Sequence, residues 1–271
     1  MLVMTATERM PTLFIPHGGG PCFFMDPPAD DPRMWDNMEV YLRGILASLP
    51  HQPKAILVVS AHWETPIPTV NVAARPPLLF DYYGFPEHTY RLTYTAPGAP
   101  GLAHRVGELL EAAGLPVADE TSRGWDHGVF IPMLLIDSDA HMPVLQLSLQ
   151  EGLEPARHLA IGRALAPLRD EGVLIIGSGM SYHNMQGFFV SQRDEAAEAF
   201  DAWLTESLAD PDRRNDSLIH WAEAPVARAC HPREEHLLPL MVAAGAASGE
   251  VGARTYTDHI RGKPISGYQF G

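Results

Sequence analysis

The sequence is poor in cysteine, in long apolar runs and in positive charge, and each shortage excludes a class of protein. Only two cysteines occur, Cys22 and Cys230, which excludes a disulfide framework and a cysteine-rich zinc site and favours a reducing compartment. No run of about eighteen apolar residues appears, so no transmembrane span is expected. Residues 1–10 contain Glu8 and Arg9 and lack an apolar core of signal-peptide length. The expected location is therefore cytoplasmic.

Acidic residues outnumber basic ones. The chain has 33 Asp and Glu against 19 Lys and Arg, which gives a formal net charge of −14. A surface of this sign opposes non-specific binding to nucleic acid or to an anionic membrane, so neither is expected as a partner. A small anionic substrate is not excluded, because a local arginine, histidine or metal can override the overall field.

What the sequence does contain is a regular alternation of short apolar runs with segments of helical periodicity. Its 271 residues, 46% of them hydrophobic, suffice for one large α/β domain or two small ones. The pattern predicts strands at 12–16, 55–60, 67–73, 143–149 and 173–177, an extended segment at 267–271, and helices at 36–49, 101–114, 128–136, 154–170, 192–208 and 234–247. Neither a repeat nor a linker interrupts it. We therefore predict a three-layer α/β/α fold with a mostly parallel central sheet, in which residues 1–271 form a single domain.

Five histidines lie at the ends of predicted strands or at the starts of predicted helices: His17, His62, His127, His183 and His236. His17, His62 and His183 each follow an apolar strand by zero to six residues. Because ligands of open α/β sheets bind outside the carboxyl ends of the strands, these three imidazoles should meet at one edge. Imidazole is the commonest protein ligand of first-row divalent metals and a general base near neutral pH. The arrangement predicts a metal centre that performs chemistry.

The two earliest histidines have different local settings. His17 precedes Gly18–Gly20, where the backbone can approach a ligand closely or adopt positive φ. The same glycines also fit a structural histidine in a tight turn, so both interpretations stay open for His17. His62 emerges from a strongly apolar strand and needs a polar partner. Metal ligation is the favoured interpretation for His62.

The next two histidines are candidates for work on the substrate. His183 lies in a turn rich in glycine and serine, beside Asn184. We interpret His183 as an acid/base catalyst or a further ligand rather than as a hydrogen-bonded loop histidine. His127 follows Asp126, which could hold the local turn or support the imidazole from behind. For His127 a functional and a structural role are weighted equally.

His231 and His236 flank a segment that reads as a helix start. Their spacing of five does not match the i, i+4 geometry that places two ligands on one helix face, so only one of them is expected to bind directly. Glu234 and Glu235 suit the positive end of the helix dipole. We expect them to be solvated first-turn carboxylates, with ligation by one of them as the alternative.

Residues 75–100 form a long loop rich in proline, tyrosine and glycine. Loops of this length often act as lids or binding loops. Its tyrosines either line a pocket for an aromatic ring or pack the loop against the core; they are Tyr82, Tyr83, Tyr90 and Tyr94.

Taken in order, these motifs resemble the class III extradiol ring-cleaving dioxygenases, specifically the DOPA 4,5-dioxygenase-like (LigB-type) branch. The matching pieces are Pro16-His17-Gly18, Ser60-Ala61-His62-Trp63, Asp126-His127-Gly128, Gly177-Ser178-Gly179 with His183-Asn184, and Glu235-His236-Leu237-Leu238-Pro239-Leu240 with Gly245-Ala246-Ala247. They span residues 16–247, nearly the whole chain. Each motif alone is moderately specific, and five in this order are a specific signature.

The resemblance implies a non-haem Fe(II) that binds a catechol through its adjacent hydroxyls and O2 at an open position. The ring is then cleaved beside the two hydroxyls rather than between them. On this basis His17 and His62 are two metal ligands. His183 is the acid/base that takes a catechol proton and later returns it, and His127 is a second pocket histidine that orients substrate or stabilises charge.

The third ligand departs from the broader class, in which a glutamate completes a two-histidine, one-carboxylate triad. Here the corresponding segment offers His236, as in the DOPA dioxygenase-like branch, and we assign His236 as the third ligand. Additional binding by His183, His231 or Glu235 stays open. A third neutral ligand leaves the site one charge more positive, which favours a dianionic catecholate. Three histidines also suit zinc, so Zn(II) in purified protein would not identify the working metal.

Two other functions compete with the dioxygenase. A zinc hydrolase would use a metal-bound water activated by His183 or His127 and would be indifferent to O2. A non-catalytic relative with a vestigial metal site would turn over no catechol. The sequence leaves DOPA, protocatechuate, caffeate and other catechols as candidate substrates, with Arg75, Arg91 and Arg123 as candidates for holding a substrate carboxylate. A homodimer is the expected assembly.

Overall fold

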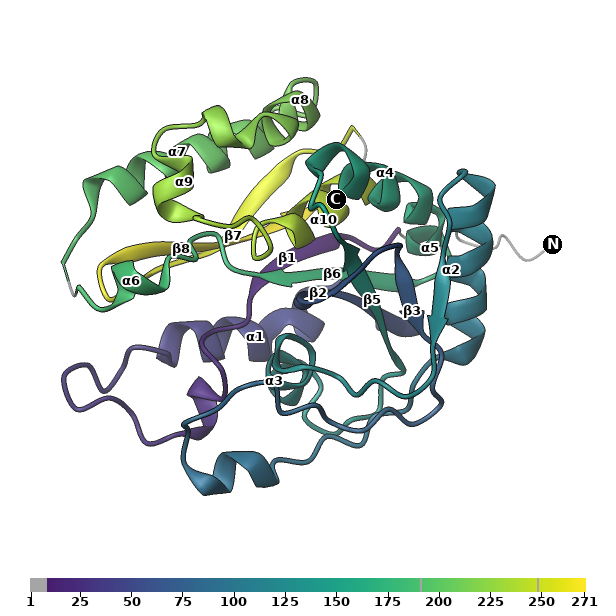
Figure 1. Ribbon diagram of the computed structural model, residues 1–271, viewed down its shortest axis with the longest axis horizontal. Helices are drawn as coiled ribbons and strands as arrows, with labels where there is room; N and C mark the ends of the chain where they lie inside the picture. Colours follow the sequence, from purple (N-terminus) through teal and green to yellow (C-terminus); the bar gives the residue numbers. More distant parts are fainter. Residues whose placement is uncertain (1–8, 191, 248) are drawn as a thin grey trace.

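An eight-stranded sheet forms the centre of the protein, with helices on both faces (Figure 1). The computed structural model describes residues 9–190, 192–247 and 249–271. The strands are β1 (Thr12–Pro16), β2 (Ala55–Thr65), β3 (Thr69–Asn71), β4 (Ala118–Glu120), β5 (Val144–Gln150), β6 (Val173–Gly179), β7 (Gly252–Ile260) and β8 (Lys263–Phe270). Their order in the sheet is β4-β3-β5-β2-β6-β1-β8-β7.

The four central strands, β5, β2, β6 and β1, are parallel neighbours. Their apolar runs are buried on both faces, as Ile56–Val59 of β2 illustrates, and continuous apolar runs of this kind are typical of a covered parallel sheet. The β7–β8 hairpin adds antiparallel strands beside β1, and β3 pairs antiparallel with β5. The predicted α/β fold with a mostly parallel sheet is confirmed.

Helices cover the two faces unequally (Figure 1). Helices α1 and α3 lie on one face, and α10, α4 and α7 lie on the other. The longer helices are α1 (Asp36–Ser48), α2 (Pro100–Ala112), α3 (His127–Ile136), α4 (Pro155–Leu165), α7 (Glu195–Ala209) and α10 (Leu238–Ala246). Shorter ones are α5 (Pro167–Asp170), α6 (Met185–Phe188), α8 (Arg214–Ile219) and α9 (Ala227–Cys230), with single 3-10 turns at Cys22–Phe24, Glu87–Arg91 and Trp221–Glu223. In the described part of the chain, every helix is too short or too polar to cross a bilayer.

Prolines explain where two predicted helices differ from the structure. The helix predicted at 154–170 is divided into α4 and α5, because Pro167 has no N–H to continue the ladder and restricts the residue before it. The helix predicted at 234–247 begins only at Leu238, with Pro239 in its first turn, where the missing N–H costs nothing. His236 therefore stands on the turn that leads into α10 rather than on the helix itself.

Strand β2 is longer than the predicted run 55–60 and contains a register shift that matters for the site. Its pairing with β5 is regular up to Val59 and resumes at Glu64 after an irregularity. Bulges of this kind bend a strand and re-aim its side chains. His62 lies inside the irregular stretch. The strands β4 and β7 were not predicted at all, and residues 1–8, 191 and 248 of the predicted domain lie outside the described residues.

Candidate metal centre

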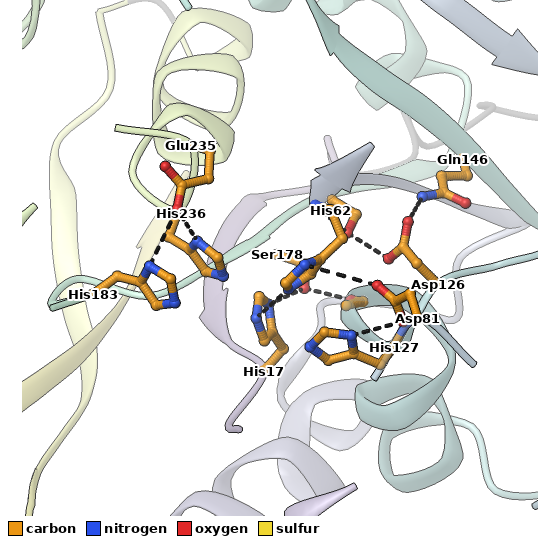
Figure 2. A network of polar contacts seen from close by, with 12 residues as sticks. His17, His62, Asp81, Asp126, His127, Gln146, Ser178, His183, Glu235 and His236 are labelled. Atoms are coloured by element: carbon orange, nitrogen blue, oxygen red, sulfur yellow. Dashed lines mark hydrogen bonds and ion pairs between the residues drawn. The ribbon is translucent and has the colours of Figure 1, made fainter. Parts of the chain in front are cut away.

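All five histidines singled out in the sequence converge on one cavity of about 360 Å³ at the carboxyl edge of the central strands. Figure 2 shows their rings around a common space. Each comes from a different element: His17 directly follows β1, His62 is in β2 and His127 opens α3. His183 lies between β6 and α6, and His236 precedes α10.

Three of these histidines offer ligand nitrogens close enough for one ion. His17, His62 and His236 each contribute one ring nitrogen, and these three nitrogens lie within 4.8 Å of one another. The Nε2 atoms of His17 and His62 are 3.2 Å apart. His17 and His236 are almost completely buried, so water does not compete freely at this position.

Hydrogen bonds fix which nitrogen of two of these rings faces the others. The Ser178 hydroxyl donates to the backbone carbonyl of Gly128, so its oxygen is left to accept from Nδ1–H of His17, at 3.1 Å. Nδ1 of His236 lies 2.9 Å from Oε1 of Glu235, a carboxylate that can only accept when ionised. In both rings the lone pair is therefore on Nε2.

This donor set fits a divalent metal. The Nε2 lone pair of His17 faces Nε2 of His62 at 3.2 Å, and one cation can take electron pairs from both rings when His62 carries its hydrogen on Nδ1. Metal–nitrogen bonds of about 2.0–2.1 Å bring neighbouring ligand nitrogens to roughly this separation. Burial, reinforced by the neighbouring imidazoles, holds the pKa of His17 and of His236 well below the usual range. Burial also lowers the pKa of His62, to about 3, and all three rings are thus in the neutral form that binds metal.

Two carboxylates flank the histidines, one on each side of the cavity (Figure 2). Oε1 of Glu235 contacts Nδ1 of His236 at 2.9 Å and Nδ1 of His183 at 3.2 Å. Burial raises the pKa of Glu235, but the hydrogen bond from His183, a backbone hydrogen bond and the nearby charges of His183 and Arg233 together outweigh burial, and the net direction is downward. The expectation that Glu235 is a solvated helix-start carboxylate is wrong, because the helix begins later and the side chain turns inward to the two rings.

Asp81 is the second carboxylate, and sequence reasoning missed it. Its Oδ1 contacts Nδ1 of His127 at 2.8 Å, and its Oδ2 lies 3.8 Å from Nδ1 of His62. Burial raises the pKa of Asp81, but the hydrogen bonds and the charge of His127 bring it below the usual value. Nothing beside Asp81 in the sequence distinguishes it from an ordinary loop residue, so only its place within the suspected loop 75–100 pointed toward it.

Asp126 holds the local structure, which is one of the roles expected for it. The side chain is completely buried and accepts hydrogen bonds from Ser60 Oγ at 2.6 Å and Gln146 Nε2 at 2.5 Å. Arg123 donates both to Asp126, at 3.1 Å, and to the backbone carbonyl of His62, at 3.0 Å. Burial raises the pKa of Asp126 although the bond from Ser60 opposes this. The network ties the irregular stretch of β2 to the start of α3.

His231 is engaged away from the trio. It is completely buried, its Nε2 lies 2.9 Å from the carbonyl oxygen of Ser181, and its ring packs against Phe200 and Trp221. None of the three groups of close ligand atoms in the described part of the chain contains His231, whereas His236 belongs to two of them.

The cavity walls are mostly apolar. Side chains that line it besides the histidines include Met34, Trp35, Phe85, Met180, Phe188 and Ile260. The loop 75–100 contributes Phe85 to this wall, while the buried Tyr82 uses its hydroxyl to bond the carbonyl of Thr89 at 2.8 Å. The ring of Tyr82 also packs against His127, with centroids 5.9 Å apart, so this tyrosine supports a site histidine without lining the cavity itself.

Arg261 is the one arginine among the described residues that line the cavity. It pairs with Asp30 at 3.0 Å. The three arginines considered from the sequence lie elsewhere. Arg123 serves the Asp126 network, Arg91 pairs with Glu87 at 2.6 Å, and Arg75 lines a separate cavity.

Comparisons with known proteins agree with this geometry. Residues 11–271 match the family described as the catalytic LigB subunit of aromatic ring-opening dioxygenase. The chain is 36% identical to "Dioxygenase tasH" of Hapsidospora irregularis, over 98% of this chain and 88% of that protein. It is 44% identical to "4,5-DOPA dioxygenase extradiol" of Beta vulgaris, over 72% of this chain and 74% of that one.

A curated bacterial protein and a solved bacterial structure also match over most of the chain. The "4,5-DOPA dioxygenase extradiol" of Escherichia coli K12 is 34% identical over 92% of this chain and 89% of its own length. The crystal structure of an uncharacterized protein from Escherichia coli K12 superposes with a TM-score of 0.75 at 30% identity, covering 97% of this chain and all of that one. With the histidine-lined cavity at the sheet edge, these matches show that the chain belongs to the LigB family of class III extradiol dioxygenases.

Proposed function

We propose that the protein opens the ring of a catechol-type substrate by extradiol cleavage with O2, at a non-haem Fe(II) held by His17, His62 and His236. The observation that supports this most directly is the convergence of three ring nitrogens within 4.8 Å at the base of the cavity. Relatives named as extradiol dioxygenases supply the reaction class. Zinc suits the same three ligands and is expected as a substitute metal in purified protein.

Bound Fe(II) would bring catechol and O2 together and carry electrons between them. The protein's own contribution begins with the cavity, whose volume of about 360 Å³ suits a small aromatic ligand. Trp35 and Phe85 line this cavity and offer apolar surface to an aromatic ring. Beside such apolar walls the charge of a catecholate is felt more strongly by the surrounding groups than in bulk water.

His183 and His127 act on the substrate in different ways in this proposal. Nδ1 of His183 bonds to Glu235, which leaves Nε2 for the cavity. There Nε2 takes the proton of one catechol hydroxyl, holds it and returns it when the ring opens. His127, with Nδ1 bonded to Asp81, presents Nε2 to the same space and orients the substrate oxygen.

Arg261 is the residue that we propose for a substrate carboxylate, in place of Arg75, Arg91 and Arg123. It lies on the cavity wall, where its positive charge attracts a carboxylate, and it pairs with the largely exposed Asp30 at 3.0 Å. The choice between DOPA, protocatechuate, caffeate and other catechols is left to the assay. The homodimer, the cytoplasmic location and the extent of one domain over residues 1–271 stay predictions.

The test is anaerobic reconstitution of metal-free protein with Fe(II) or with Zn(II), followed by air and a panel of catechols. A yellow product and O2 uptake are expected with Fe(II) alone, and both should vanish in His62→Ala and persist in His104→Ala. His104 is a suitable control because its side chain is 78% exposed on α2. If the iron form gave neither coloured product nor O2 uptake with any catechol, and the zinc form hydrolysed esters or amides, the proposal would be overturned in favour of a hydrolase.

A further inference from the structure

We propose that Asp81 is a positioning residue that sets two rings of the cavity at once. One of its oxygens holds His127 and the other faces His62, so that Nε2 of each ring points into the cavity. The inference rests on the proposed function for the roles of the two histidines: His127 orients the substrate and His62 is a metal ligand. The arrangement itself follows from the contacts of Asp81.

The backbone next to Asp81 is clamped beside the start of α3. The N–H of Leu79 donates to the carbonyl of Trp125 at 2.7 Å, and the N–H of Trp125 donates to the carbonyl of Pro77 at 2.9 Å. A Cβ atom added at Gly124 would lie 2.7 Å from the Pro77 carbonyl oxygen, so the two segments touch where a side chain would not fit. Asp81 is thus delivered to the site by a fixed backbone pairing.

Asp81 caps α3 from a distant segment. Its Oδ1 accepts from the backbone N–H of His127, the first helical residue, at 2.9 Å, and from Nδ1 of the same residue at 2.8 Å. Asp126 occupies the usual capping position but makes no cap bond, because its carboxylate is turned to Ser60 and Gln146. The free N–H groups and the positive dipole of the helix start stabilise a carboxylate placed there.

The bond to Oδ1 decides the tautomer of His127. An ionised carboxylate only accepts, so Nδ1 carries the hydrogen and the lone pair of the neutral ring stays on Nε2. His127 is buried and lines the cavity, and its ring centroid is 3.9 Å from that of His62. A ring so packed presents one nitrogen to the carboxylate and the other to the substrate space.

The second oxygen acts on His62. Oδ2 lies 3.8 Å from Nδ1 of His62, beyond a hydrogen bond but close enough for the negative charge to favour a hydrogen on that nitrogen. Nε2 of His62 then keeps its lone pair toward His17, 3.2 Å away. Since three histidines bring no ligand charge, a carboxylate behind His62 supplies part of the negative charge that a ligand carboxylate would give.

The experiment uses the zinc-loaded protein without catechol or O2, so it does not depend on turnover. Asp81→Ala, Asp81→Asn and the control Glu87→Ala are compared by ¹⁵N NMR of the histidine rings and by zinc affinity in competition with a chelator at fixed pH. Glu87 belongs to the same segment, carries the same charge and has a side chain that is 86% exposed.

In Asp81→Ala the Nδ1–H signature of His127 should disappear and zinc binding should weaken by about tenfold, the lower end for loss of a partner behind a metal ligand. Asp81→Asn should keep the His127 tautomer, because the amide oxygen still accepts. Its NH2 group then faces Nδ1 of His62 and favours a hydrogen on Nε2, so zinc should still bind more weakly than in the wild type. Glu87→Ala should match the wild type in both measurements.

Wild-type zinc affinity and an unchanged His127 signature in Asp81→Ala would overturn the proposal. If Asp81→Ala fails to fold, Asp81→Asn decides: wild-type zinc affinity in that variant also overturns it. The predicted shifts combined with no ring cleavage by the iron-loaded wild type would sink the proposed function and leave the role of Asp81 intact.

Discussion

The cavity is built from two histidine–carboxylate groups that resemble each other in composition and differ in geometry. In the first, which we term the loop group, Asp81 joins His62 to His127 (Figure 2). In the second, the turn group, Glu235 joins His236 to His183. Each group pairs one proposed metal ligand with one histidine proposed to act on the substrate, through a single carboxylate.

The two carboxylates divide their oxygens differently. In the turn group one atom, Oε1 of Glu235, lies 2.9 Å from His236 and 3.2 Å from His183, whose rings stack with centroids 3.3 Å apart. In the loop group Oδ1 of Asp81 serves His127 at 2.8 Å and Oδ2 stands 3.8 Å from His62. The turn group therefore couples ligand and proton carrier tightly, whereas the loop group lets the two rings respond separately.

The largest expected effect is on zinc affinity, and it distinguishes the two proposed metal ligands from His127 and His183. His62→Ala and His236→Ala should each weaken zinc binding by more than about 100-fold, because a direct ligand matters more than the partners behind it. His127→Ala and His183→Ala should stay within about tenfold of the wild type, since they leave the three ligand nitrogens in place. Chelator competition measures all four. If His127→Ala weakened zinc binding as much as His62→Ala, His127 would itself be a metal ligand and the assignment of ligands in the loop group would be wrong.

The next effect is on the kinetic constants, and it distinguishes His183 from His127. With Fe(II) and an active catechol, His183→Ala should lower kcat by about 10²–10⁴-fold while metal content is kept, because a positioned acid/base is lost. His127→Ala should raise KM more than it lowers kcat, as expected for a residue that orients substrate. Steady-state kinetics with metal analysis of the same samples gives the comparison. Equal losses of kcat in the two variants would contradict the division of roles.

A smaller effect compares the carboxylates. Glu235→Ala should weaken zinc binding more than Asp81→Ala, on the order of 100-fold against 10-fold, because Glu235 bonds a ligand ring at 2.9 Å and Asp81 stands 3.8 Å from one. The double variant should be close to the product of the two, since the carboxylates share no ring. Equal losses in the single variants would show that the difference in geometry has no energetic consequence.

The last effect concerns His231, whose Nε2 contacts the carbonyl of Ser181 in the turn that carries His183. Burial lowers the pKa of His231 to about 4, from an unfolded value of about 6.5. Its contribution to stability is complete above pH 6.5 and is lost as pH falls toward 4, because the unfolded chain binds the proton first; at pH 5 the loss is about 2 kcal/mol. Thermal melts of metal-free protein at pH 7.5 and pH 5 should show a smaller drop for His231→Gln than for the wild type. His104→Gln is the control, and an unchanged drop in His231→Gln would refute the assignment.

Much of the site could be predicted from residue order. His17 and His62 follow buried strands, and parallel strands end at the same edge, so their meeting follows from the pattern. His183 could be placed there for the same reason. The motif order around His127 and His236 then identified the family, although the helix expected to carry His236 starts two residues after it, at Leu238.

The carboxylates could not be predicted in the same way. Glu235 was singled out in the sequence but was expected to be exposed to solvent, because the acidic side chains at a helix start are normally exposed. Asp81 lies 46 residues before His127 in the sequence, and only the pairing of Leu79 with Trp125 brings them together. The hydrophobic periodicity of a sequence carries no information about a contact between a loop and the start of a distant helix.

The sequence by itself determined the alternation of strands and helices, the edge at which the histidines gather and the family to which they belong. These depend on local hydrophobic pattern and on the shared direction of parallel strands. Only the tertiary structure decided which nitrogen of each ring faces the cavity and which carboxylate holds it. Those choices depend on hydrogen bonds between segments far apart in the chain, whose geometry exists only after the sheet, the loop and α3 have packed together.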